Sequence, residues 1–275
     1  MQNAKCKISD FGFREDSDSQ FAILPSLKFA IRNSQFAILF ILFGSPCFCG
    51  VGIVSTGARN MGIGGAVCGI AEPTSMLVNP AGLSFGSQSQ MTYSYATDKE
   101  RGDWWTTVYP DVQNGVGAVS FVKRGDEKMI YLSYGKNKAF RWNGAYGMNL
   151  KFVKIKEESG IGIDGGLLVS PKQRINLGLS VANLISSKIG NISQDRGFIL
   201  GLSFKRSEKT FLAQFNLQKE NMALFGVEFI RGDETIRLGV EDGGIALGLG
   251  GELFGLNINW AVVRSCHLLS LGFTY

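Results

Sequence analysis

Apolar residues alternate with small or polar residues, at a period of two, through most of the chain from residue 90 to residue 275. The last segment, HLLSLGFTY (267–275), is the clearest: one face carries His, Leu, Leu, Phe and Tyr, and the other carries Leu, Ser, Gly and Thr. The segments 174–183, 197–205 and 255–263 repeat this pattern. Because successive side chains of a strand point to opposite faces, the alternation predicts β-strands with one apolar face each.

Turn signals divide the alternating region into thirteen predicted strands, and WWTTVY (104–109) is a candidate for a fourteenth. The other strands are expected near 91–97, 115–122, 128–135, 144–155, 160–170, 209–218, 223–231, 234–241 and 244–253. Bacterial single-chain barrels have even strand numbers. We therefore expect an all-β fold, a transmembrane antiparallel β-barrel of fourteen strands, with twelve as the alternative.

Several features favour a membrane barrel over a soluble β-sandwich, which also alternates. Strands of about ten residues recur with tight turns, and this is the length that a tilted strand needs to cross a bilayer. The face opposite the bulky residues carries Gly, Ser, Asn and Gln, which suits a polar lumen. The charged fraction is only 19%, and the 36 glycines are interleaved with large apolar residues, as in a curved sheet with a crowded inner face.

The chain ends on an aromatic residue, with apolar residues at every second position before it. Leu271, Phe273 and Tyr275 form this series. The series resembles the C-terminal signal that the bacterial barrel-assembly machinery reads. We therefore expect that machinery and outer-membrane lipid as partners, and the bacterial outer membrane as the location.

The first 49 residues are typical of an upstream extension followed by a signal peptide. A purely apolar run, FAILFILF (36–43), follows basic residues and precedes the small and polar residues of GSPCFCG, which is the order of a secretory signal. The run is too short to span a bilayer, which takes about 20 residues. Cys47 and Cys49 lack the residues that a lipobox requires before its cysteine, so we do not expect a lipoprotein.

Residues 57–85 break the period of two ahead of the first strand. Small residues dominate here, Pro80 disfavours helix at Asn79, and Gly82 permits a turn back toward the first strand. The expected regions are an upstream extension plus signal peptide at 1–49, an N-terminal hatch segment inside the lumen at 50–89, and the β-barrel at 90–275.

The same residues carry a family resemblance. Their Gly-Ala-Arg, Met-Gly and Asn-Pro-Ala-Gly-Leu runs resemble the N-terminal segment of the FadL-type outer-membrane transporters of hydrophobic compounds. They look closer still to the related PorV/PorQ-type proteins, which are linked with type IX secretion. The matching residues are Gly57, Ala58, Arg59, Met61, Gly62, Gly64, Gly65, Ala66, Asn79, Pro80, Ala81, Gly82 and Leu83.

The resemblance implies a fourteen-stranded barrel whose N-terminal segment folds inward as a hatch. In the transporters of this group, a hydrophobic substrate leaves the lumen sideways through a kink in the wall. In the PorV-like relatives, the barrel serves protein secretion and attachment.

No motif in the sequence is typical of an enzyme or of a metal site. Nucleophilic sites need a histidine in a pocket, whereas the single histidine, His267, lies on the apolar face of the last strand. One histidine with Cys68 and Cys266 makes no convincing zinc site, and whether these two cysteines form a disulfide is left open. The glycine run at 62–65 lacks the spacing of a dinucleotide loop. The charged residues expected to face the lumen, as a solvated or ion-paired lining, are Asp164, Glu228, Arg237, Glu241 and Glu252.

Two functions follow from these observations. The first is a passive transporter or pore for small compounds, hydrophobic ones among them. The alternative is a non-enzymatic barrel component of a secretion or surface-attachment system, with secreted proteins as partners. We expect no enzyme activity and no cofactor. The net charge is +5, but no Lys/Arg cluster lies beside aromatic residues, which argues against nucleic acid as a partner.

N-terminal sequencing of the exported protein tests the expected region boundaries. Because residues 1–49 contain the signal-peptide order, the mature chain should begin close to Gly50. A mature chain that begins upstream of residue 36 would contradict the prediction.

Overall fold

The computed structural model describes residues 57–98, 102–111, 115–138, 143–189, 194–217, 221–241 and 244–275. All of them belong to one compact unit, Ser45–Tyr275. The predicted signal peptide and its cleavage site lie outside the described residues. Among the described residues, no helix is long and apolar enough to cross a membrane.

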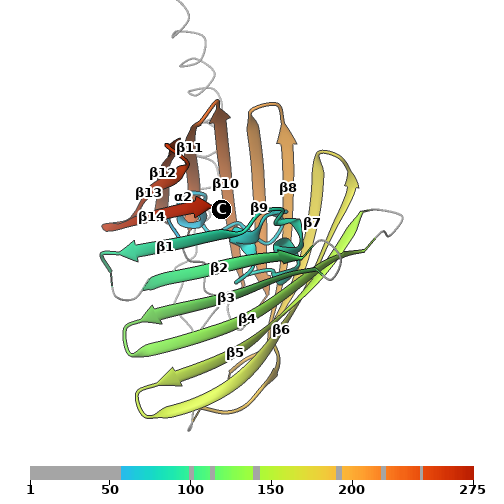
Figure 1. Ribbon diagram of the computed structural model, residues 1–275, viewed down its shortest axis with the longest axis vertical. Helices are drawn as coiled ribbons and strands as arrows, with labels where there is room; N and C mark the ends of the chain where they lie inside the picture. The colour runs from blue at the N-terminus through green and yellow to red at the C-terminus, as the bar shows by residue number, and fades with distance from the viewer. Residues whose placement is uncertain are drawn as a thin grey trace, which may run out of the picture. The chain divides into compact units, whose positions relative to one another are not determined.

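Fourteen strands form one closed antiparallel barrel, in which each strand pairs with its neighbours in sequence and β1 pairs with β14 (Figure 1). The prediction of fourteen strands is therefore confirmed. The strands are β1 (Gln90–Ala96), β2 (Asp103–Asp111), β3 (Gly115–Arg124), β4 (Glu127–Lys138), β5 (Gly144–Ile155), β6 (Glu158–Lys172), β7 (Ile175–Ser186), β8 (Gly197–Arg206), β9 (Lys209–Leu217), β10 (Met222–Arg231), β11 (Glu234–Glu241), β12 (Gly244–Leu253), β13 (Leu256–Val263) and β14 (Cys266–Thr274).

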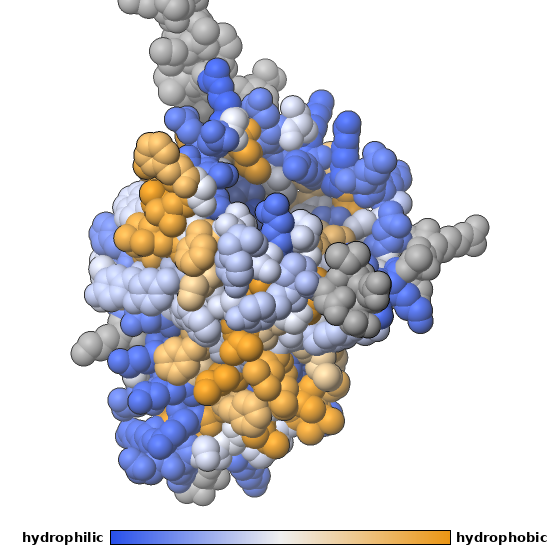
Figure 2. Space-filling model, in the orientation of Figure 1, coloured by the Kyte–Doolittle hydropathy of each residue, from blue (hydrophilic) through white to orange (hydrophobic). Residues whose placement is uncertain are grey.

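The period of two separates two chemically different faces. In β14, Leu269, Leu271 and Phe273 are exposed on the outer face, whereas Leu268 and Ser270 are buried on the inner face. Figure 2 shows apolar side chains gathered over the middle of β3 to β6, with hydrophilic ones nearer the strand ends. An exposed apolar band of this extent is costly in water and favourable in lipid, so the outer face is suited to a bilayer.

The two ends of the barrel differ in their connections. We call the end where β1 begins and β14 ends the C-terminal rim. Each rim has four connections of two residues, but the two longest connections, 97–102 and 187–196, both lie at the opposite rim. The β6–β7 pair is the irregular part of the wall, with register shifts between Ile163 and Gly165 and between Val169 and Lys172.

Residues 57–86, which we call the N-terminal segment, form no strand. They contain α2 (Ala58–Gly62) and two 3-10 turns, η1 (Pro73–Ser75) and η2 (Pro80–Phe85). The side chain of Asn79 accepts a hydrogen bond of 3.1 Å from the Ala81 N–H at the start of η2. This cap, followed by Pro80, makes the Asn-Pro-Ala run a turn with a defined start.

The N-terminal segment packs against the inward faces of the strands. The Ala58 N–H donates to Ser270 Oγ at 2.7 Å, and the Cys68 N–H donates to Gln214 Oε1 at 2.8 Å. Asn79 Nδ2 donates to the backbone oxygen of Leu167 at 3.1 Å. In the first two bonds, polar side chains of the wall satisfy segment N–H groups that have no strand partner, as buried N–H groups require. In the third, a segment side chain bonds to the backbone of β6.

A row of inward glycines makes this contact possible. A Cβ at Gly178 would overlap the Cys68 carbonyl group, and a Cβ at Gly201 would overlap the Gly69 nitrogen. We call the full row the glycine belt: Gly135, Gly147, Gly166, Gly178, Gly201, Gly226, Gly239 and Gly248. Several members face each other across paired strands, so the row runs around the barrel at the level of the segment.

The glycine belt predicts a difference between inward and outward glycines. Gly178→Val places two methyl groups against the N-terminal segment and should lower the free energy of unfolding by about 2 kcal/mol or more, as overpacking does. Gly165→Val is the control, because the nearest atom to a Cβ there is 3.9 Å away on the outer face. Urea unfolding in lipid vesicles measures both. Equal effects of the two substitutions would contradict the packing described here.

Candidate functional site

A polar cavity of about 290 Å³ lies inside the barrel at the C-terminal rim. Its mouth includes Gln90, Asn257 and Thr274, which lie within two residues of the ends of their strands. Its inner end includes Gly57 and Trp104. The N-terminal segment therefore supplies part of the cavity wall, and the strands β1, β2, β10, β11, β13 and β14 supply the rest.

A charged network forms one side of this cavity. Arg59 donates two hydrogen bonds to the Glu228 carboxylate, from Nε and Nη2, each of 3.0 Å. Arg59 also pairs with Glu72 of the same segment. Arg237 donates from Nε to Glu228 at 2.8 Å and from Nη1 to Asn259 at 2.9 Å. The network thus joins the N-terminal segment to three strands of the wall.

Burial makes this network sensitive to the loss of a charge. The side chain of Glu228 is 3% exposed and that of Arg237 is 5% exposed, whereas Glu72 is 47% exposed. Burial alone would lower the pKa of Arg59, but the carboxylates of Glu72 and Glu228 raise the pKa above its ordinary value. Arg59 therefore stays cationic. Two cations and two anions balance, so the cavity wall carries little net charge.

A second ion pair lies at the irregular part of the wall. Lys151 Nζ is 2.6 Å from Asp164 Oδ1, and the same oxygen accepts the Asn183 N–H at 2.8 Å. Asp164 lies between the paired positions Ile163 and Gly165, where the β6–β7 register shifts. The Asp164 carboxylate thus accepts a hydrogen bond from a backbone N–H at the point where the β6–β7 pairing is interrupted.

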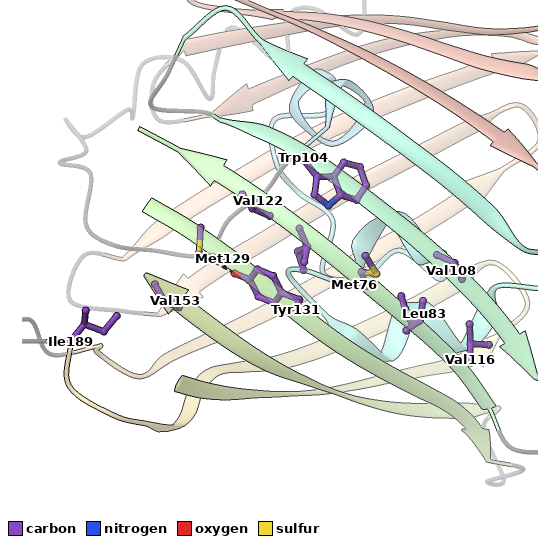
Figure 3. Packing of buried hydrophobic residues seen from close by; sticks show 12 residues of the cluster. Met76, Leu83, Trp104, Val108, Val116, Val122, Met129, Tyr131, Val153 and Ile189 are labelled. Carbon is purple, nitrogen blue, oxygen red and sulfur yellow. Dashed lines mark hydrogen bonds between the residues drawn. The ribbon is translucent and has the colours of Figure 1, made fainter. Parts of the chain in front are cut away.

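A large apolar cluster occupies the inner faces of β2 to β5 (Figure 3). We call it the luminal apolar cluster: Met76, Leu77, Leu83, Trp104, Val108, Val116, Ala118, Val122, Met129, Tyr131, Val153 and Ile189. Part of it lies toward the opposite rim, because Val122 and Val153 come near the ends of their strands and Ile189 belongs to the connection after β7. The inner face of the wall therefore carries an apolar cluster as well as the polar cavity.

The other charged residues named from the sequence lie away from the network. Glu241 is half-buried at the end of β11, and Glu252 is exposed near the end of β12, although both share the inward parity. His267 is exposed on the outer face of β14. These positions give no pocket that holds a histidine beside a nucleophile.

The two cysteines of the described residues are free and buried. They belong to different groups of buried residues, Cys68 to one with Ile199 and Cys266 to one with Leu268. Burial raises the pKa of the Cys68 thiol to about 12, so it stays protonated at neutral pH.

Sequence reasoning missed Lys151, and it named Arg59 and Glu228 without pairing them. Lys151 has the same parity as Gly147 and Asn149 of β5, so the period of two could have placed it on the inner face. Arg59 and Glu228 are 169 residues apart, and no local signal links them. Their pairing depends on how the N-terminal segment lies in the barrel.

Known structures give an independent view of the fold. No protein-family model matches the sequence, and no curated protein matches it. A FadL homologue from Pseudomonas aeruginosa matches with a TM-score of 0.56 and 12% identity, over 84% of this chain and 99% of that chain. The fold of this chain is therefore similar to that of this solved barrel. At this identity the likeness concerns the fold alone.

Two further matches have the same character. The Pseudomonas putida toluene transporter TodX matches with a TM-score of 0.55 and 11% identity, over 79% of this chain and 96% of that chain. The CymD monoaromatic hydrocarbon channel matches with a TM-score of 0.51 and 12% identity, over 80% and 96%. The FadL-like resemblance noted in the sequence thus extends to the architecture of the barrel.

Glu228→Gln tests the charged network. The substitution keeps the size of the side chain but leaves Arg237 without its carboxylate and Arg59 with Glu72 alone, so we expect the barrel to lose about 3 kcal/mol of stability. Urea unfolding in vesicles measures the loss. The control is Glu252→Gln, which removes an exposed charge of the same inward parity and should cost less than about 1 kcal/mol. A Glu228→Gln variant as stable as the control would contradict the role given to the network.

Proposed function

We propose that this chain is an outer-membrane barrel for the passive transport of small hydrophobic compounds. The luminal apolar cluster is the observation that carries the proposal. A barrel interior that only conducts ions and polar solutes needs a polar lining throughout. Here most inward side chains of β2 and β3 are apolar, and the cluster includes Trp104, Met129 and Tyr131.

The outer membrane is the location that fits this barrel. The exposed apolar residues on the outer faces of the strands give outer-membrane lipid a surface to cover. The solved barrels that share the fold include a FadL homologue and TodX. We propose further that Leu271, Phe273 and Tyr275 guide the barrel-assembly machinery, because they end the last strand on its lipid-facing side.

Small aromatic compounds are the substrate class that we favour. Of the similar structures, TodX is described as a toluene transporter and CymD as a monoaromatic hydrocarbon channel. A small ring suits a lumen in which the N-terminal segment already fills much of the space. We assign no reaction to the chain, since transport of this kind needs positioned apolar surface and no catalytic group.

The N-terminal segment is proposed to act as a hatch that restricts the lumen. It carries the matched motif residues, and most of them are buried against the strands: Gly57, Ala58, Met61, Gly62, Gly65, Asn79, Pro80, Ala81 and Gly82. Arg59 ties it to the wall through Glu228. The likeness to PorV/PorQ-type proteins rests on these motif residues.

Uptake of toluene by proteoliposomes tests the proposal. Vesicles that contain the barrel should take up toluene from the surrounding buffer faster than protein-free vesicles do. Met129→Lys should lower the added flux about tenfold, because a cation among buried apolar side chains costs at least the ~1.4 kcal/mol that a tenfold change represents.

The matched control is Asp126→Lys, which places a cation on an exposed turn next to β4. It should leave toluene flux at the wild-type level. Wild-type flux equal to that of empty vesicles would refute the transport function. Equal flux through the two lysine variants, both shown to be heat-modifiable barrels, would refute the role of the luminal apolar cluster.

A further inference from the structure

Three lysines form a row across the outer face of the barrel, at the rim opposite the C-terminal rim. Lys123 of β3 is paired in register with Lys128 of β4, and Lys128 is paired with Lys154 of β5. We call these three residues the lysine row. All three are exposed, and each is next in sequence to a buried member of the luminal apolar cluster, so their side chains point outward.

The chain leaves the charges of this row uncompensated. Side chains directly opposite each other on neighbouring strands have Cβ atoms about 5 Å apart, and like charges at such positions repel each other. None of the three lysines forms an ion pair with a carboxylate of the described residues. The carboxylate of Glu127 is paired with Arg124, and Asp103 is opposite Lys123 in the register without an ion pair between them. An external anion could therefore relieve the repulsion within the row.

The lysine row borders the apolar band of the outer face. Two residues along each strand toward its middle, about 7 Å away, are Phe121, Ile130 and Phe152, which are paired with one another and exposed. The turns that contain the exposed residues Asp126 and Glu157 lie on the other side of the row. Figure 2 shows this boundary at its lower left, where hydrophilic side chains adjoin apolar ones over the left ends of these strands in Figure 1. Long cationic side chains at the edge of an apolar band can reach the level of lipid phosphates.

The row occupies one part of this rim. The outward residues nearest the same rim on β9 to β13 are apolar: Leu217, Ala223, Val240, Ile245 and Val262. The two longest connections of the barrel, 97–102 and 187–196, lie at this rim, and the longer loops of bacterial barrels are extracellular. The lysine row therefore faces the outer leaflet of the membrane, at a single place on the wall.

We propose that the lysine row binds a phosphorylated glycolipid of the outer leaflet. Phosphate groups of the headgroup lie among the ammonium groups, and the acyl chains lie along Phe121, Ile130 and Phe152. Lysine recognises phosphate as a point charge on a flexible stem, so the row needs no fixed fork geometry. A bound phosphate replaces repulsion between neighbouring lysines by attraction to a shared anion. The proposal rests on the outer-membrane location proposed above and is independent of the substrate that the barrel carries.

Binding of lipid A, an acylated disaccharide with two phosphates, tests the site. Native mass spectrometry of the full barrel in detergent measures the bound lipid. The row variant, Lys123→Gln with Lys128→Gln and Lys154→Gln, should bind lipid A at least about tenfold more weakly than the wild type, because it loses three attractions to phosphate. Wild-type affinity in the row variant would overturn the proposal.

The matched control removes three exposed cations at the other rim. It combines Lys172→Gln, Arg174→Gln and Arg206→Gln, which change the net charge by the same amount. The control should bind lipid A as the wild type does. Equal loss of binding in the control and the row variant would show that net charge alone attracts the lipid, and would overturn the site.

Two comparisons identify the ligand. Lipid A without its phosphates should bind the wild type at least about tenfold more weakly than lipid A does, because the ammonium groups then lack their anion. Excess inorganic phosphate should not displace lipid A, because the free ion has no acyl chains to hold it at the row. Displacement by inorganic phosphate, or equal affinity for phosphatidylglycerol, would overturn the assignment to a phosphorylated glycolipid.

The middle lysine provides a test that needs no binding measurement. In phosphatidylcholine vesicles, Lys128→Gln should raise the urea concentration at which the barrel is half unfolded, because it removes repulsion from both neighbours. In vesicles that contain lipid A the same substitution should lower this midpoint, because the bound phosphates lose their central partner. A shift of the same sign in both kinds of vesicle would contradict the proposal.

Lipid binding and transport can fail separately. The row variant should take up toluene as the wild type does, since the row lies on the outer face and the luminal apolar cluster on the inner face. Wild-type vesicles without toluene flux would refute the transport function, whereas the lipid A measurements use no toluene and decide the lysine row alone.

Discussion

The contact between the glycine belt and the backbone of the N-terminal segment is the constraint on which the rest of the structure depends. At Gly178 and Gly201, strand backbone meets segment backbone with no room for a Cβ. The segment can therefore lie inside a fourteen-stranded barrel that side chains would otherwise fill. Irregular backbone at membrane depth is tolerated where protein surrounds it and satisfies its polar groups. Here Gln214 accepts a hydrogen bond from a backbone N–H of the segment, and Asn149 and Ser203 donate to its backbone oxygens.

This packing also divides the lumen. The segment meets apolar side chains of β2 to β5 on one side, with Met76 and Leu83 as its own contribution. On the other side Arg59 meets Glu228. A single segment thus completes an apolar surface and a polar cavity at once. Trp104 belongs to the cluster and also lines the cavity.

The period of two was sufficient to predict the wall, because each strand must present an apolar face to lipid and a small or polar face to the lumen. It also placed Glu228 and Arg237 one strand apart, and they are opposite each other in the register. The parity of Glu241 and Glu252 was read in the same way, but it does not tell how near the end of a strand a residue lies. That position leaves Glu252 exposed.

Contacts of the N-terminal segment could not be predicted in this way. The segment has no period, so its partners are set by the shape of the lumen and not by local pattern. Arg59 reaches Glu228 across 169 residues, and the Asn183 N–H reaches Asp164 because the β6–β7 register shifts. Trp104 appeared in the sequence as one aromatic residue of a candidate strand. Its ring packs closely against Gly57, which comes from outside that strand and which no local pattern links to it.

Hydrogen–deuterium exchange of the barrel in lipid nanodiscs tests the central claim most directly. The stretch 62–69 has little regular secondary structure, yet it packs against the glycine belt and is almost wholly buried. If the segment lies inside a closed barrel, peptides that cover 62–69 should exchange as slowly as those of β7 and β8. Exchange within seconds, at the rate of an exposed loop, would contradict the account.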